Sequence, residues 1–123
     1  MRFLNTMRHV KNWPTYYARK MFGGLNEGFV FTTAAGRIEV PARLMHTFKE
    51  IFFDSQYLGH LPESVTSKHN PVVIDIGANV GYFSIFALGY LRDPRVYSFE
   101  PIPANFLQMT TYHTEVGGGF LAY

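Results

Sequence analysis

Two carboxylates and two glycines between residues 75 and 100 have the types and spacing of a ligand-binding site. Asp75 interrupts the apolar run Val72–Ile76, and Gly77 and Gly81 follow that run. Glu100 ends a second apolar run, nineteen residues after Gly81. An acidic residue in this position, at the end of the next strand, is placed to accept hydrogen bonds from ribose hydroxyls. These residues favour a nucleoside-binding site over the alternative, an ordinary strand-to-helix connection.

The elements around these residues would place them at one edge of a sheet. The run Val72–Ile76 predicts a strand buried on both faces, as in the centre of a parallel sheet. A glycine turn connects it to an apolar helix predicted over residues 82–91. Ligands of open α/β sheets bind at the carboxyl edge of the strands, beside helix N-termini. The spacing D-x-G-x-x-x-G, with Asn79 where a middle glycine is often found, disfavours an NAD-dependent oxidoreductase, whose fingerprint is G-x-G-x-x-G.

Two strings in this region resemble those of a known family. VVIDIGANVGYFSIFA and VYSFEPIPANFLQM are similar to the two motifs of FkbM-type S-adenosylmethionine-dependent methyltransferases, and the resemblance covers about Pro71 to Met109. It implies a class I methyltransferase sheet, S-adenosylmethionine as the cofactor, and methyl transfer to an oxygen of a small molecule or sugar. The chain departs from the family after the second string, where members tend to have asparagines and this chain has Thr110, Thr111 and His113.

The candidate cofactor site consists of residues in or beside the two strings. We expect the two glycines to let the backbone approach the cofactor closely, and Glu100 to bind the ribose. The Asp75 carboxylate would order the turn or bind the cofactor's amino group through water. The expected cofactor-binding residues are Asp75, Gly77, Ala78, Asn79, Gly81, Tyr82, Glu100, Pro101 and Ile102.

The other members of the site have more specific expected roles. Ala78 and Asn79 would supply turn amides, Tyr82 would border the pocket, and Pro101 with Ile102 would form an apolar wall for adenine. None of these groups performs chemistry, because methyl transfer from a sulfonium needs mainly in-line positioning and sometimes a general base. In similar enzymes those groups come from later strands, so the catalytic residues are unknown.

The fold class expected from these patterns is α/β: a partial class I methyltransferase (Rossmann-like) parallel sheet, preceded by N-terminal helices and a β-hairpin. Residues 1–70 would form the N-terminal extension and residues 71–123 a truncated cofactor-binding half. Helices are predicted over 1–10, 14–22, 41–52 and 104–115, with the hairpin from Phe29 to Val40. A third strand would begin at Phe120, and residues 54–70 would form a connecting loop. In that loop Tyr57 either reaches the pocket or packs as an ordinary tyrosine.

Composition limits the other possibilities. Apolar residues make up 47% of the 123 residues and charged residues 16%, which fits a globular protein. There is no cysteine, which suits a reducing compartment, and a cytoplasmic location is expected. The apolar runs are shorter than the ~20 residues needed to span a bilayer. The histidines lack metal-ligand spacing, so no metal site is expected. The first 26 residues have a charge of +5, best explained as an exposed helix face rather than a nucleic-acid or membrane contact.

Two functional classes remain open from the sequence. The first is a methyltransferase in a truncated form, whose acceptor is a small molecule. The second is a non-catalytic nucleoside-binding or interaction module. The chain stops at Tyr123, before a strand that would pair with the other side of the Ile74 strand. We therefore expect an open sheet edge, and either self-association or a second chain that completes the sheet.

Overall fold

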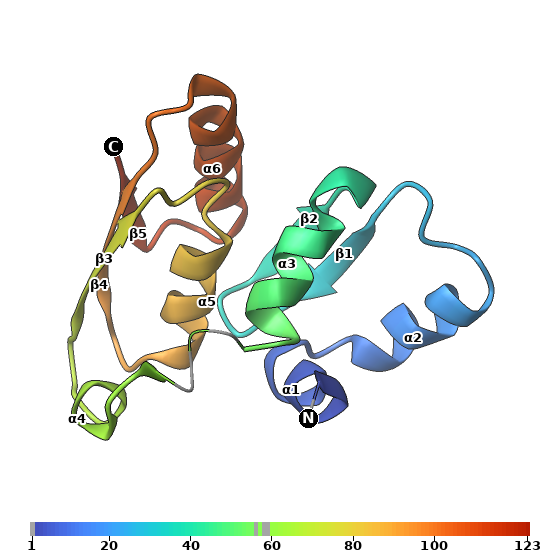
Figure 1. The fold of residues 1–123 in the computed structure, drawn as a ribbon, viewed down its shortest axis with the longest axis horizontal. Helices are drawn as coiled ribbons and strands as arrows, with labels where there is room; N and C mark the ends of the chain where they lie inside the picture. Colours follow the sequence, from blue (N-terminus) through green and yellow to red (C-terminus); the bar gives the residue numbers. More distant parts are fainter. Residues whose placement is uncertain (1, 56, 58–59) are drawn as a thin grey trace.

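The computed structural model describes residues 2–55, 57 and 60–123. It contains an antiparallel pair of strands and a three-stranded parallel sheet in the order β3-β4-β5. Helices α5 and α6 lie on the same side of the parallel sheet, the side that faces the hairpin (Figure 1). The predicted α/β class is confirmed. In chain order the elements are α1 (Arg2–His9), α2 (Trp13–Met21), β1 (Phe29–Thr32), β2 (Arg37–Val40), η1 (Ala42–Leu44), α3 (Met45–Phe52), α4 (Glu63–Thr66), β3 (Val72–Ile76), α5 (Tyr82–Tyr90), β4 (Arg95–Phe99), α6 (Pro103–Glu115) and β5 (Phe120–Ala122).

The N-terminal helices and the hairpin form as the sequence predicts. Pro14 lies in the first turn of α2, where backbone N–H groups have no partner within the helix, so its missing N–H costs no hydrogen bond. The hairpin pairs Phe29 with Val40 and Thr32 with Arg37. The side chain of Asn12, between α1 and α2, donates to the carbonyl of Val30 and accepts from the N–H of Thr32, both at 2.8 Å. These bonds fix the helix pair to the edge of the hairpin. Met1, the first residue of the predicted first helix, lies outside the described residues.

An aromatic core joins the N-terminal part to the parallel sheet. Phe48 of α3 stacks between Phe31 and Phe52, with ring centroids 4.2 and 4.3 Å away. Its edge meets Tyr82 of α5 at 5.4 Å and 90°. Buried residues from α2 to β5 form one continuous cluster, and aromatic contacts of this kind add to simple area burial. The division into residues 1–70 and 71–123 stays a prediction.

The parallel sheet has both of its helices on one face. Ile74 of β3 pairs with Tyr97 of β4, which in turn pairs with Leu121 of β5. Because β3, β4 and β5 follow in order across the sheet, two right-handed crossovers place α5 and α6 on the same face. The other face is open, so Ile74 is 63% exposed and Ile76 83% exposed. The prediction that this strand is buried on both faces is therefore wrong: only its helix-facing side is covered.

The segment between α3 and β3 is more structured than a plain loop. It contains the short helix α4, and His69 forms an isolated parallel bridge with Arg92. Gln56, Leu58 and Gly59, which belong to the predicted loop, lie outside the described residues. Within the part of the chain that the structure describes, no helix has the length and apolar character required to cross a bilayer.

Candidate functional site

The turn after β3 is held by backbone conformations that its sequence suits. Gly77, Asn79 and Gly81 all have positive φ, at 73°, 54° and 85°, a region that glycine adopts freely and asparagine tolerates. A Cβ on Gly81 would lie 2.8 Å from the Met109 side chain, so glycine lets α5 begin close against α6. A Cβ on Gly77 would meet nothing within 4 Å. The backbone at Gly77 is therefore open to a ligand.

Glu100 connects the two motifs of the sequence. Its Oε2 accepts a 2.7 Å hydrogen bond from the N–H of Asn79, and its Oε1 accepts one of the same length from the N–H of Ile102. Glu100 is buried, at 8% exposed. A carboxylate has about four lone-pair sites, so each oxygen retains capacity for a further donor such as a ribose hydroxyl.

Asp75 belongs to a hydrogen-bond chain under the turn. Its Oδ2 accepts from the hydroxyl of Ser84 at 2.7 Å, and the oxygens of Ser84 and Ser98 are 2.6 Å apart. Ser84 has one proton and gives it to Asp75, so Ser98 must donate to Ser84. Burial raises the pKa of Asp75 above its ordinary value of 3.8, the Ser84 hydrogen bond lowers it, and the charge of Glu100 raises it again. Such a carboxylate is stabilised by a cation placed beside it.

A hollow of about 220 Å³ lies beside the turn. Asp75, Tyr82 and the turn form one wall, and helix α3 forms another with Thr47, Glu50 and Ile51. Tyr57 and Phe83 close a third side, with ring centroids 4.7 Å apart. Tyr57 lines the hollow, which is one of the two positions expected for it, and the sequence motifs do not predict the α3 residues. Thr47 and Glu50 carry little sequence signal for a site, because polar residues on an amphipathic helix are typical of its solvent-facing side.

The predicted site residues divide into two groups in space. Five of the nine line the hollow, whereas Gly81, Glu100, Pro101 and Ile102 lie outside its lining. The Asn79–Glu100 bond joins the last three to the hollow. Pro101 and Ile102 are exposed, as a ligand-facing wall requires. The five lining residues are Asp75, Gly77, Ala78, Asn79 and Tyr82.

The turn amides are already used within the protein. The N–H groups of Gly77 and Ala78 both donate to the carbonyl of Phe99, at 2.9 and 3.0 Å, and that of Asn79 donates to Glu100. These bonds fix the ends of β3 and β4 to each other. The N–H groups of Ala78 and Asn79 are therefore occupied within the protein, which differs from the expectation that they face a cofactor. A ligand at this turn would meet carboxylates and open space.

Tyr82 and Phe83 both line the hollow, and Tyr82 is the more deeply buried of the two. Tyr82 is 1% exposed, and its hydroxyl is 2.9 Å from that of Tyr112, which donates to the carbonyl of Glu39 at 2.8 Å. Burial raises the pKa of Tyr82 above its ordinary value. Phe83 is only partly buried and contacts Tyr57 at the hollow. The Tyr82 hydroxyl is therefore used within the protein, and Phe83 is the more exposed of the two rings at the hollow.

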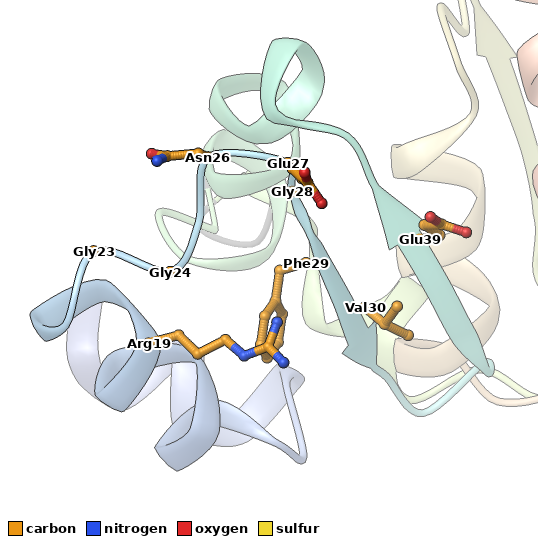
Figure 2. Close-up of a pocket in the computed structure, with 9 residues that line it drawn as sticks. All are labelled: Arg19, Gly23, Gly24, Asn26, Glu27, Gly28, Phe29, Val30 and Glu39. Atoms are coloured by element: carbon orange, nitrogen blue, oxygen red, sulfur yellow. The ribbon is translucent and has the colours of Figure 1, made fainter.

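A larger hollow, of about 440 Å³, lies away from the turn. Figure 2 shows it between α2, the glycine-rich segment 23–28 and the hairpin, with Arg19, Glu27 and Glu39 around it. The Arg19 guanidinium lies over the Phe29 ring, 5.8 Å from its centroid. This hollow contains none of the predicted site residues, and its mixed charges do not select one ligand class.

The fold and the site together define a partial Rossmann-like arrangement: a parallel sheet, a glycine turn at the carboxyl end of β3, and a buried acid at the end of β4. Two curated methyltransferases are similar to the chain. The first is 31-O-demethyl-FK506 methyltransferase FkbM of Streptomyces tacrolimicus, 43% identical over 61 residues, which is 48% of this chain and 22% of the relative. The second is methyltransferase sdnD of Sordaria araneosa, 37% identical over 57 residues, 46% of this chain and 20% of the relative.

The matched segments span about a fifth of the length of each relative. No protein-family model matches the chain. The resemblance to FkbM-type methyltransferases that the two motif strings indicate is confirmed over about half of the chain.

Proposed function

We propose that this chain provides the cofactor-binding half of an S-adenosylmethionine-dependent methyltransferase, which transfers a methyl group to an oxygen of a small molecule or sugar. The observation that supports it best is the convergence of Asp75, Gly77 and Glu100 on one turn. A buried carboxylate with spare lone pairs suits ribose hydroxyls. The space beside Gly77 suits close approach of a ligand to the backbone.

The residues present fit such a cofactor at both of its ends. Asp75 in the hollow suits the ammonium group of the amino-acid end, since an adjacent cation favours the ionised form of Asp75. Ile102, which is exposed two residues after Glu100, suits the apolar face of adenine. When bound, the cofactor supplies an electrophilic methyl group on a sulfonium. The chain's own residues hold and orient the ligand, and this positioning is the main requirement of the transfer.

Ligand titration tests this proposal directly. In calorimetry, S-adenosylmethionine and its demethylated product should bind at one site per chain, and NAD should give no heat of binding because the dinucleotide spacing is absent. Binding of NAD in preference to S-adenosylmethionine would overturn the proposal, as would failure of both nucleosides to bind at millimolar concentration.

The open face of the parallel sheet favours the second candidate, an interaction module. Six large apolar side chains on this face are between 40% and 83% exposed, and contiguous apolar patches of this kind mark interaction sites. We propose that copies of the chain associate through this face, because contact with a second copy would remove its exposed apolar side chains from water. The six residues are Val72, Ile74, Ile76, Phe99, Leu121 and Tyr123.

A further inference from the structure

Helix α3 places one charged side chain at the hollow beside the glycine turn. Glu50 and Gly77 both line the hollow, and Thr47 lies about one turn before Glu50 on the same helix. Among the described residues of this lining, the charged side chains are Glu50 and Asp75. The hollow therefore has a negative field that is stronger than either carboxylate produces alone, and a cation is the ligand group that this field favours.

The position of Glu50 is fixed by the packing of its helix. Phe48 is fully buried and stacked between two aromatic rings, and its edge contact with Tyr82 connects α3 to α5. Ile51, next to Glu50, is buried as well. Because this packing holds α3, a ligand that binds Glu50 has to order the side chain but does not have to move the helix. The backbone at Glu50 is thus fixed beside the hollow.

The carboxylate of Glu50 retains capacity for a ligand. Its neighbour on the helix, His46, approaches to 3.6 Å, which exceeds hydrogen-bond distance, and that imidazole is 86% exposed. Asp75, by contrast, already accepts the Ser84 hydroxyl on one oxygen. Among the described residues, no hydrogen bond to the Glu50 carboxylate is present, so beside the His46 ion pair it has lone pairs for a donor of three protons such as an ammonium group.

We infer that Glu50 binds the ammonium group at the amino-acid end of the nucleoside cofactor, so that an N-terminal helix contributes directly to the cofactor site. This inference rests on the proposed function and extends it to a residue outside both sequence motifs. The adenosine end lies at Glu100 and Ile102, and the amino-acid end enters the hollow between the turn and α3. Glu50 then selects ligands that retain the amino acid over those that lack it.

Two ligands that differ only at that end test the inference. S-adenosylhomocysteine has the amino-acid group, whereas 5′-methylthioadenosine has the same nucleoside and thioether without it. Both are titrated calorimetrically into the full chain, into Glu50→Gln, and into the control Glu63→Gln, whose side chain lies on α4 away from the hollow. Circular dichroism with thermal melting confirms that each variant is folded.

The expected result is selective. Glu50→Gln should weaken S-adenosylhomocysteine about 10-fold or more, since a charged hydrogen bond is lost, and should leave 5′-methylthioadenosine unchanged. The control should change neither. Equal weakening of both ligands, or no change in either, would overturn the role of Glu50 and leave the proposed function standing. Failure of the unmodified chain to bind either ligand would overturn the proposed function, and this inference with it.

Discussion

The backbone N–H of Asn79 donates a 2.7 Å hydrogen bond to the Oε2 atom of Glu100. This bond joins the turn after β3 to the end of β4, so the two motifs of the sequence form one structural unit. The acid that would bind a ribose also shapes the turn beside it. Substitution of Glu100 should therefore affect ligand affinity and turn stability together, and the two effects must be measured separately.

Glu100→Ala should weaken S-adenosylmethionine binding about 10- to 150-fold, because a charged hydrogen bond of ~1.5–3 kcal/mol is lost. The same variant should lose about 1–2 kcal/mol of unfolding free energy, since the N–H groups of Asn79 and Ile102 lose their acceptor. Calorimetry and urea denaturation measure the two quantities. Glu63→Ala is the control. Unchanged affinity in Glu100→Ala would remove Glu100 from the cofactor site.

Asp75→Asn should make stability less dependent on pH. The raised pKa of Asp75 means that the folded state binds its proton more tightly than the unfolded state. Stability from this group is therefore present below the ordinary value of 3.8 and is lost as pH rises through the raised value. Asparagine still accepts from Ser84 and has no charge to bury. In thermal melts from pH 3 to 8, the stability of the variant relative to that of the unmodified chain should increase as pH rises. Parallel curves of stability against pH would contradict this.

The Tyr82–Tyr112 pair should behave as one energetic unit. Tyr112 donates to Glu39, so Tyr82 must donate to Tyr112. Tyr112→Phe removes the hydroxyl that pairs with the buried Tyr82 hydroxyl and the Glu39 carbonyl, and should cost about 1–3 kcal/mol of unfolding free energy. Tyr82→Phe should cost about 0.5–1.5 kcal/mol. The double variant should cost less than the sum. Urea denaturation measures all three, with the partly exposed Tyr90→Phe as control; strict additivity would show that the hydroxyls do not interact.

Charge on the open sheet face should separate associated copies. Light scattering of the unmodified chain should give a mass above that of the monomer, rising with concentration. Ile74→Lys and Leu121→Lys each place an ammonium on this exposed face and should restore the monomer mass. Met21→Lys, at a position 80% exposed on α2, should not. A concentration-independent monomer in the unmodified chain would show that the face does not self-associate.

Local rules determine much of what the sequence alone reveals. The β-branched run, the glycines at 77 and 81, and Glu100 at the end of the next strand identify the turn and the acid that meets it. Proline at 14 lies in the first turn of α2, as proline requires. The hairpin follows from two strand-like runs around a glycine turn. Each of these signals acts over a few residues, so it can be read without the rest of the fold.

Long-range packing decides the rest. The sequence of an apolar strand does not indicate whether one face or both are covered. Ile74 is exposed because α5 and α6 both lie on the other face of the sheet. The use of the turn amides depends on the carbonyl of Phe99 in a neighbouring strand. Glu50 lies 25 residues before Asp75 in the chain and reaches the same hollow only because an aromatic core packs α3 against α5. Contacts between distant segments come from the tertiary fold, because no local pattern specifies them.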